Sequence, residues 1–330
     1  RIMRSTLLLF FAATLSLVIS SCGKDVDESN EQAHRRYIEA FIENNYPGIE
    51  PTESGLYILD SIPGTGTKVS DSSYVLIDYT ITYLDGYYID YTSADIARQL
   101  GQFSYQKLYE PRIWSMTDQE SGIKEIFSYM REGGEITAII PPWLMGEDTE
   151  NLTGNSDGTA KIYNISLKKV IKDVIAYQDS LLNDYVKERW PYLDTTEAGF
   201  YFLKTKSNPD PTDTLLDEQS VKLRYIGRYL NGQVFDTNIA DTAKKYGIYS
   251  QCSYELLSFK YFDNEDDALN QNSLVTGFSK ALWRMTFDER CRTFFNSNFG
   301  YGNSGSGNIP GYTPLCFEIQ VEKNPEKKDE

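Results

Sequence analysis

Two stretches of the chain alternate between apolar or aromatic residues and polar residues, and they lie far apart in the sequence. The first stretch covers residues 74–83 and the second covers residues 221–230. A period of two is typical of a β-strand with one buried face. Asp85-Gly86 follows the first stretch and Asn231-Gly232 follows the second. Such residue pairs favour tight hairpin turns, so we expect the same hairpin to occur twice.

Apolar residues recur at helical spacing before each predicted hairpin. The first such stretch ends near Asn45, before Pro47, and the second ends near Trp190, before Pro191. A proline is a typical place for a helix to stop, so each hairpin is expected to follow a helix. The remaining patterns predict two short helices and two late strands, over residues 123–130, 278–285, 161–170 and 315–321. Few helices among several antiparallel strands indicate an α+β fold.

The chain contains two copies of one unit. The string ESGLYIL beginning at Glu53 matches EAGFYFL beginning at Glu197, and later matches follow in the same order at nearly constant separation. These later matches include Tyr79 with Tyr225, Asp90 with Asp236, Met130 with Met285 and Tyr163 with Phe317. A steady offset across so many residue types indicates a duplication.

Composition then narrows the classes of function. The chain has 330 residues, 40% of them hydrophobic and 24% charged, which is typical of about two globular domains. Its net charge of −16 argues against a nucleic-acid partner, because phosphate binding needs clustered Lys and Arg. One histidine and four cysteines exclude a His-rich metal cage and a dense disulfide scaffold. We expect no metal and no cofactor.

The N-terminal segment differs from the rest of the chain. Arg1 and Arg4 precede an apolar run, and residues 19–22 read Ile-Ser-Ser-Cys. The run is shorter than the roughly 20 residues that span a membrane, so it is typical of a secretory signal. Its end looks like a bacterial lipobox with Cys22 as the lipidated residue, although an ordinary signal with an incidental cysteine is the alternative. The expected location is therefore the cell envelope of a Gram-negative bacterium, as an outer-membrane lipoprotein, periplasmic or surface-exposed.

Three cysteines remain if Cys22 carries lipid, and an odd number allows at most one disulfide. These are Cys252, Cys291 and Cys316. Cys291 and Cys316 lie in strand-like runs and are expected to be buried thiols.

An ordered set of features in each unit resembles a known family. A strand bearing Tyr is followed by a turn with an aromatic-Asp pair, a short helix that ends in Met, an aromatic-Gly loop and a final strand with Phe. Each unit thereby resembles the FK506-binding-protein (FKBP) type of peptidyl-prolyl cis-trans isomerase. The resemblance implies two tandem FKBP-like domains, each an antiparallel half-barrel sheet wrapped on a short helix and preceded by a helix. The predicted boundaries are a signal peptide at 1–22, a tether and helix at 23–52, domain 1 at 53–172, a linker helix at 173–196, domain 2 at 197–324 and a tail at 325–330.

For the second unit, the resemblance implies a nearly complete substrate pocket. Phe278 is the expected floor, where the family usually has Trp, and Tyr301 is the expected hydrogen-bond donor to a substrate carbonyl. Asp236 is the expected rim carboxylate, and the backbone N–H of Val275 is expected to hold the peptide. The walls and the remaining apolar lining are expected to be Tyr225, Phe235, Phe317, Leu274 and Ile309. Ordinary core packing is the alternative for any one of these aromatic residues.

Isomerisation of an X–Pro bond suits a site of this composition. The barrier of about 18–20 kcal/mol comes from amide resonance, and no proton or covalent bond has to move. A dry aromatic pocket favours the twisted amide, and a hydrogen bond can hold the substrate carbonyl. A thousandfold acceleration needs only about 4 kcal/mol of differential stabilisation.

The first unit departs from the family pattern. It keeps Tyr79, Asp90 and Tyr163, but Ile123 replaces the floor aromatic and Ile89 replaces the wall. The donor position becomes Met145, and the residues before the helix, Gln119 and Glu120, are polar. We interpret this unit as a binding or scaffold domain that has lost most activity.

The predicted function is X–Pro isomerisation in exported proteins, mainly by the second unit. The alternative is a non-catalytic, chaperone-like lipoprotein that binds peptides. Expected partners are proline-containing unfolded or exported polypeptides and the membrane, through Cys22. Matched insertions around 95–105 and 241–254 either bind polypeptide or only cover the sheet edge. The GxGxxG string at 300–305 is expected to be a loop without nucleotide, and the acidic run at 263–267 a solvated loop without calcium.

Overall fold

A computed structural model describes residues 29–146, 159–251, 254–271 and 273–325. Cys22, Cys252 and the whole predicted signal segment lie outside the described residues. No helix in the described ranges is both long and apolar enough to span a membrane.

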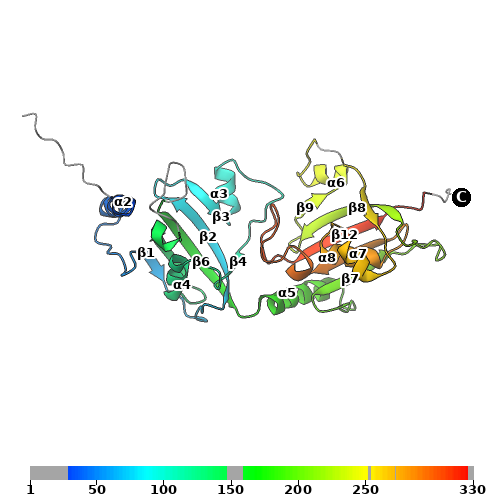
Figure 1. Cartoon of the computed structure of the whole chain (residues 1–330), viewed down its shortest axis with the longest axis horizontal. Coiled ribbons are helices and arrows are strands. Elements are labelled where there is room, and N and C mark those ends of the chain that lie inside the picture. The colour runs from blue at the N-terminus through cyan, green and yellow to red at the C-terminus, as the bar shows by residue number, and fades with distance from the viewer. Residues whose placement is uncertain (1–28, 147–158, 252–253, 272, 326–330) are drawn as a thin grey trace, which may run out of the picture.

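The described chain forms two six-stranded antiparallel sheets with the same topology (Figure 1). In the first sheet the strand order is β1-β5-β6-β2-β3, and β4 pairs with β2. In the second the order is β7-β11-β12-β8-β10, and β9 pairs with β8. The strands of the first sheet are β1 (Tyr57–Ile62), β2 (Tyr74–Tyr83), β3 (Tyr88–Tyr91), β4 (Arg112–Ser115), β5 (Glu135–Ile140) and β6 (Lys161–Ile171). Those of the second are β7 (Phe200–Lys206), β8 (Ser220–Tyr229), β9 (Val234–Thr237), β10 (Leu257–Lys260), β11 (Arg290–Phe295) and β12 (Leu315–Val321).

Helices cover the sheets and precede them. The described helices are α2 (Asn30–Asn45), α3 (Ala94–Gln99), α4 (Ser121–Ser128), α5 (Val174–Arg189), α6 (Ala240–Lys245), α7 (Glu265–Asn270) and α8 (Thr276–Trp283). Two 3₁₀ turns, Pro142–Leu144 and Ser297–Phe299, occupy equivalent places after β5 and β11. We call the first sheet with α2–α4 domain 1, and the second sheet with α5–α8 domain 2. The α+β duplication predicted from the sequence is confirmed, while the predicted domain boundaries stay a prediction.

The short helix inside each domain lies against its own sheet, and a glycine in its first turn permits the approach. A Cβ at Gly122 would lie 2.5 Å from the Ile140 side chain, and one at Gly277 would lie 2.4 Å from the Phe295 ring. Contacts this short are incompatible with a side chain larger than hydrogen. The matched glycines of the two units therefore have a packing role.

The helix before each domain packs on that domain, as the sequence predicts. Ile38 and Ile42 of α2 are buried against residues of domain 1. Leu182 and Val186 of α5 are buried against domain 2, where they meet Phe294 of β11. Figure 1 shows α5 below the strands of domain 2, where it also joins the two sheets.

Three local predictions differ from the structure. The helices expected at 123–130 and 278–285 begin and end two residues earlier, because α4 starts at Ser121 and α8 at Thr276. The acidic run expected as a loop begins helix α7 instead, with the Asn264 side chain accepting a hydrogen bond from the backbone N–H of Asp266. A polar side chain at that position caps a helix, and acidic residues in the first turn favour its dipole.

Candidate active site

Four aromatic rings form the centre of domain 2. The ring of Phe317 in β12 makes edge-to-face contacts with the rings of Phe235 and Phe278, at centroid distances of 5.6 and 5.1 Å. Phe295 of β11 stacks on the other side of Phe317 at 5.8 Å. Edge-to-face contacts are favourable because the positive edge of one ring meets the negative face of another. All four rings are at least 94% buried, so the cluster forms a dry apolar base.

One polar pair borders this base. The Tyr225 hydroxyl donates a 2.8 Å hydrogen bond to Oδ2 of Asp236, and Oδ1 of Asp236 accepts from the backbone N–H of Thr237. Burial raises the pKa of Tyr225, and the negative charge of Asp236 raises it further. The phenol therefore stays protonated and keeps Asp236 oriented. The Tyr225 ring is also 5.9 Å from the ring of Phe278, which links the pair to the floor.

Tyr301 packs against the same aromatic cluster, and its hydroxyl group could bind a ligand. Its ring is half-buried against the core of domain 2, and within the described ranges its hydroxyl has no hydrogen-bond partner. Burial raises the pKa of Tyr301, and the charge of Asp236 adds to the effect. A protonated phenol without an internal acceptor can donate to a ligand carbonyl.

The remaining predicted lining residues join the same cluster. Ile309 is buried, and Leu274 and Val275 are partly buried. Val275 precedes α8, and its carbonyl accepts the backbone N–H groups of Phe278 and Ser279. The nine residues assigned to the second pocket therefore meet at one place in the fold, and their roles stay predictions.

Three neighbours of the site were not identified from the sequence. Gly227 lies opposite Phe317 in the sheet, and a Cβ there would lie 2.6 Å from the Phe235 ring, so its small size makes room for that ring. The Asn238 side chain accepts the backbone N–H of Tyr225. Tyr229 packs on Phe235 at 5.0 Å. A glycine inside a predicted strand is the one signal available, since it often marks a close approach.

The equivalent polar pair in domain 1 is covered by two basic side chains. Tyr79 donates to Asp90 at 2.6 Å, as Tyr225 does to Asp236. Arg112 then donates to both the Tyr79 hydroxyl, at 2.9 Å, and Asp90, at 3.1 Å. Lys107 lies 3.9 Å from Asp90, and the Trp114 ring lies 4.9 Å from that of Tyr79. The pair is thus engaged by domain 1 itself.

One assignment in domain 1 is wrong. Ile89 was expected to form a pocket wall, but it is 38% exposed. The reason lies on the neighbouring strand, where Ile81 pairs with Asp90 as Gly227 pairs with Asp236. In domain 2, Gly227 has no side chain and leaves space for the Phe235 ring. In domain 1, the Ile81 side chain takes that space and packs against the core, so the side chain of Ile89 stays on the surface.

The other positions of the first pocket lie together in the core of domain 1. Ile123 is 2% exposed and fills the floor position. The Tyr163 hydroxyl is 3.9 Å from the sulfur of Met145, so the donor position of domain 2 is occupied here by a thioether. A thioether cannot donate a hydrogen bond. No cluster of three or more potential metal-ligating side chains occurs within the described part of the chain.

Other expectations about side chains can be compared directly. Cys291 and Cys316 are buried free thiols, as predicted. Burial raises the pKa of Cys316 to about 12 and also raises the pKa of Cys291. The GxGxxG string follows a 3₁₀ turn and lies in turns and loops, which confirms the prediction that it does not open a helix.

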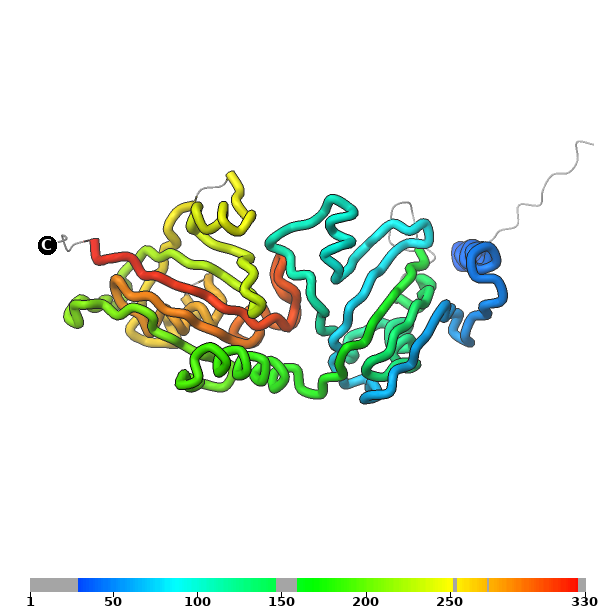
Figure 2. Tube along the Cα trace, turned by 180° about the vertical axis from the view of Figure 1, so that it is seen from behind, coloured from blue at the N-terminus to red at the C-terminus, as the bar shows by residue number. Residues whose placement is uncertain are grey.

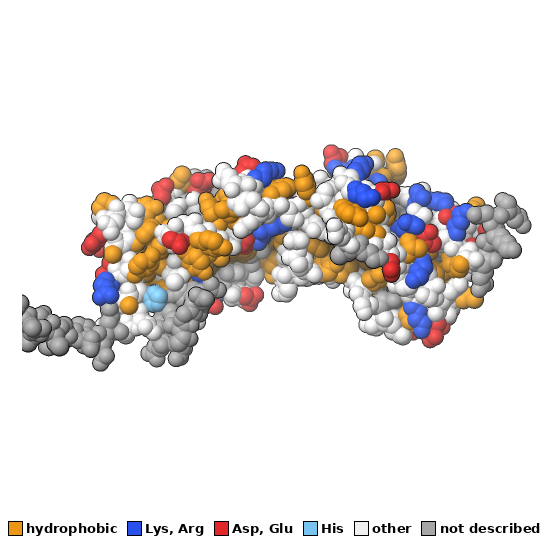
Figure 3. All heavy atoms as spheres, turned by 90° about the horizontal axis from the view of Figure 1, so that it is seen from above, with side chains coloured by type: hydrophobic (Ala, Val, Ile, Leu, Met, Phe, Trp, Pro, Cys, Tyr) orange, Lys and Arg blue, Asp and Glu red, His pale blue; other side chains and the backbone are white. Residues whose placement is uncertain are grey.

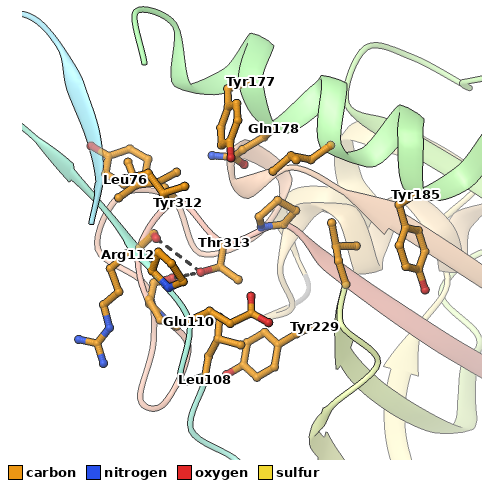
Figure 4. Close-up of a pocket in the computed structure, with 17 residues that line it drawn as sticks. Leu76, Leu108, Glu110, Arg112, Tyr177, Gln178, Tyr185, Tyr229, Tyr312 and Thr313 are labelled. Atoms are coloured by element: carbon orange, nitrogen blue, oxygen red, sulfur yellow. Dashed lines mark hydrogen bonds between the residues drawn. The ribbon is translucent and has the colours of Figure 1, made fainter. Parts of the chain in front are cut away.

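Two of the cavities near the site of domain 2 also have lining residues from domain 1. One of about 430 Å³ is lined by Tyr225 and Asp236 and also by Gln106, which comes from domain 1. The other, of about 400 Å³, lies between the domains (Figure 4). Figure 4 shows Tyr177 and Tyr185 of α5 along one side and the segment carrying Leu108 and Arg112 along another. Both cavities are therefore partly walled by domain 1.

Comparison with known proteins finds similarity to one family in domain 2. Residues 258–322 match the family model described as FKBP-type peptidyl-prolyl cis-trans isomerase. A curated relative, the FKBP-type peptidyl-prolyl cis-trans isomerase FkpA of Buchnera aphidicola subsp. Acyrthosiphon pisum, is 28% identical over 127 residues, which are 38% of this chain. The chain spans about half of that relative's length, 47%. Within domain 2, residues 258–322 therefore resemble FKBP-type peptidyl-prolyl cis-trans isomerases.

Solved structures of the same type are more distant. FkpA from Escherichia coli is 24% identical, with 51% of this chain and 71% of that chain covered and a TM-score of 0.33. A peptidyl-prolyl cis-trans isomerase from Pseudomonas syringae pv. tomato is 21% identical, with 45% and 91% covered and a TM-score of 0.32. The three FKBP domains of wheat FKBP73 are 11% identical, with 82% and 95% covered and a TM-score of 0.29.

Proposed function

We propose that the protein is an FKBP-type peptidyl-prolyl cis-trans isomerase whose catalysis resides in domain 2. The observation that carries the proposal is the convergence of a dry aromatic base, the Tyr225–Asp236 pair and the unpaired Tyr301 hydroxyl on one place. The aromatic base favours a proline ring and the twisted amide, which has lost resonance and is less dipolar. The Tyr301 phenol holds the neighbouring carbonyl while the bond turns.

Domain 1 is proposed to contribute little catalysis. Arg112 and Lys107 engage its Tyr–Asp pair, and Met145 stands where domain 2 has its phenol donor. Its floor is an isoleucine rather than a ring, so it lacks the flat surface against which a proline ring packs. Domain 1 is therefore proposed to bind or position polypeptide.

The proposed substrates are X–Pro bonds of exported proteins. The apolar N-terminal run with Cys22 supports export and a lipid anchor in the envelope of a Gram-negative bacterium. A net charge of −16 supports protein rather than nucleic-acid substrates. On the face seen in Figure 3, basic and acidic side chains of the described residues are interspersed.

A refolding assay on the full chain tests the catalytic proposal. The wild type is expected to accelerate a proline-limited refolding reaction. Tyr301→Phe is expected to reduce kcat/KM about twofold to tenfold, the effect of one lost hydrogen bond of about 0.5–1.5 kcal/mol. Asp236→Ala is expected to reduce it as well, because Tyr225 loses its acceptor.

The matched control is Asp90→Ala in domain 1, which removes the same carboxylate from the equivalent pair. Its kcat/KM is expected to equal that of the wild type. A folded wild-type chain that gives no acceleration over buffer rejects the proposal, and equal losses for Asp90→Ala and Asp236→Ala reject the assignment to domain 2.

A non-catalytic polypeptide-binding role is the second candidate, and the covered pair in domain 1 favours it. Exposed aromatic residues in the two insertions also favour it, namely Tyr105 and Tyr249. Suppression of aggregation that survives the double substitution Asp236→Ala and Phe278→Ala supports this role over catalysis. Loss of that suppression in the double variant argues against it.

A further inference from the structure

A segment of domain 1 is seated on domain 2 beside the candidate site. We call residues 103–112, which follow α3 and end at the first residue of β4, the bridging segment. Figure 2 shows the chain between α3 and β4 beside the loop that precedes β12. The two domains also touch through Tyr74 and Tyr312, whose rings lie 5.4 Å apart. Among the described residues of domain 1, only Leu108 of the bridging segment belongs to the buried core cluster of domain 2.

Leu108 anchors the segment through its side chain. It is only 9% exposed, and it belongs to the same hydrophobic cluster as Phe235, Phe317 and Ile309 of domain 2. Burying a leucine side chain is favourable because its apolar surface leaves water. Leu108 therefore behaves as a ligand side chain that domain 1 supplies to domain 2.

Backbone carbonyls of the three residues before Leu108 also face hydrogen-bond donors of domain 2. The Gln233 side chain donates to the carbonyls of Tyr105, at 2.6 Å, and of Lys107, at 2.9 Å. The single hydrogen of the Tyr229 hydroxyl is shared between the carbonyl of Gln106, at 3.2 Å, and that of Asn308 in domain 2, at 3.1 Å. Gln233 therefore provides the two main contacts to the backbone of the segment, and such contacts accept almost any sequence because every residue has a carbonyl.

Side chains at the two ends complete the contact. Gln106 donates to the carbonyl of Phe235 at 3.2 Å, and it lines the cavity that contains Tyr225 and Asp236. At the other end, Asn231 donates to Glu110 at 2.7 Å. The segment therefore borders the candidate pocket and narrows its approach.

Other side chains of the segment turn back to domain 1. Lys107 and Arg112 pair with Asp90, and the Phe103 ring stacks on that of Tyr109 at 5.3 Å. The hydroxyl of Tyr109 accepts the backbone N–H of Ser104. The segment thus has its own internal structure, and its hold on domain 2 depends mainly on Leu108 and the bound carbonyls.

We propose that the bridging segment is an internal ligand of domain 2, seated on a polypeptide-binding surface formed by Tyr229, Gln233 and the Phe235 cluster. The competing partner is an unfolded polypeptide that offers free carbonyls just before an aliphatic side chain. This inference deepens the proposed function, since it sets which chains reach the candidate site. The surface selects for an aliphatic residue and tolerates the rest of the sequence.

Peptide binding to the full chain tests this inference without a catalytic readout. The ligand is a fluorescein-labelled synthetic peptide with the sequence of residues 102–111, and binding is followed by fluorescence anisotropy. Leu108→Asp places a charge in the apolar site and frees the surface. This variant is expected to bind the peptide at least about tenfold more tightly than the wild type, because the internal competitor is removed. Adding Gln233→Ala is expected to reverse the gain.

Matched controls make the result specific. Leu100→Asp changes a leucine that is 40% exposed and outside the segment, and it is expected to bind the peptide as the wild type does. A peptide with Asp in place of its leucine is expected not to bind. If Leu108→Asp fails to fold by circular dichroism, the double variant Gln106→Ala and Glu110→Ala removes two polar contacts and takes its place.

Each outcome decides the inference. Equal affinity of the wild type and the opened variant overturns it, and so does the absence of binding to either. If the chain does not accelerate refolding but Leu108→Asp binds the peptide more tightly than the wild type, isomerase activity is rejected and the internal ligand is supported. If the chain accelerates refolding but the two proteins bind the peptide equally, only the internal ligand is rejected.

Discussion

At the scale of single residues, the two domains share one polar pair and differ in what surrounds it. Tyr79–Asp90 and Tyr225–Asp236 have nearly the same geometry, at 2.6 and 2.8 Å. The first pair also receives Arg112, whose guanidinium donates to both of its members. A carboxylate that accepts from a guanidinium has fewer lone pairs left for a ligand. The two domains therefore differ in the neighbours of the pair rather than in the pair itself.

Gly227 provides a test of packing at this scale. Its alanine variant places a Cβ within 2.6 Å of the Phe235 ring, which has to move. We expect Gly227→Ala to reduce the free energy of unfolding by about 1–3 kcal/mol, the usual cost of overpacking. Urea unfolding measures the loss. In a Phe235→Leu background the same substitution is expected to cost less, and an equal cost in both backgrounds contradicts the assigned contact.

At the scale of elements, α5 belongs to domain 2 because a buried amide fixes it there. Gln178 is fully buried, and its side-chain oxygen accepts the backbone N–H of Ser297 at 2.7 Å. Its side-chain nitrogen donates to the Ser297 hydroxyl at 3.0 Å. These bonds hold the helix against the 3₁₀ turn that follows β11, near the start of the loop that carries Tyr301.

Removal of this amide is expected to loosen the helix. Gln178→Ala leaves the buried backbone N–H of Ser297 without its acceptor, so a loss of about 1–3 kcal/mol in the free energy of unfolding is expected. The matched control is Asn183→Ala, an amide on the exposed face of the same helix. Its stability is expected to stay within about 0.5 kcal/mol of the wild type. Equal effects of the two substitutions in thermal or urea unfolding argue against the anchoring role of Gln178.

At the scale of the whole molecule, buried phenols and thiols couple stability to alkaline pH. Burial raises the pKa of Cys316 to about 12, and it also raises the pKa values of Cys291, Tyr79 and Tyr225. In the unfolded chain these groups titrate near their ordinary values of 9 for Cys and 10 for Tyr. The unfolded state therefore binds fewer protons than the folded state above pH 9, and stability falls as pH rises from about 9 towards 12.

Urea unfolding at pH 7.5, 9 and 10.5 under reducing conditions measures this dependence. The free energy of unfolding is expected to be nearly constant up to about pH 8.5 and to decrease above it. Cys316→Ala removes one of the responsible groups, so its decrease is expected to be shallower than that of the wild type. An unchanged slope in this variant would show that Cys316 does not contribute.

Local pattern alone predicted a large part of the architecture. The bounds of β2 and β12 agree with the predicted strands, because alternation records which side chains face a core. The duplication and the matched Tyr–Asp pairs were also visible, since both copies keep the same order of residues. Helix α7 was missed because a short acidic stretch lacks an apolar period, although Asn264 is a capping residue.

The sequence by itself determined that one α+β unit is used twice and that the second copy keeps more aromatic residues at the matched positions. Only the tertiary structure decided which side chains surround each of these sets of residues. Ile81 excludes position 89 from the first pocket, Arg112 covers its polar pair, and Leu108 enters the core of the second domain. The first two contacts lie within domain 1, whereas that of Leu108 joins the two copies. No periodic pattern or repeat records them, because they depend on how strands pair within a domain and on how the two finished domains pack together.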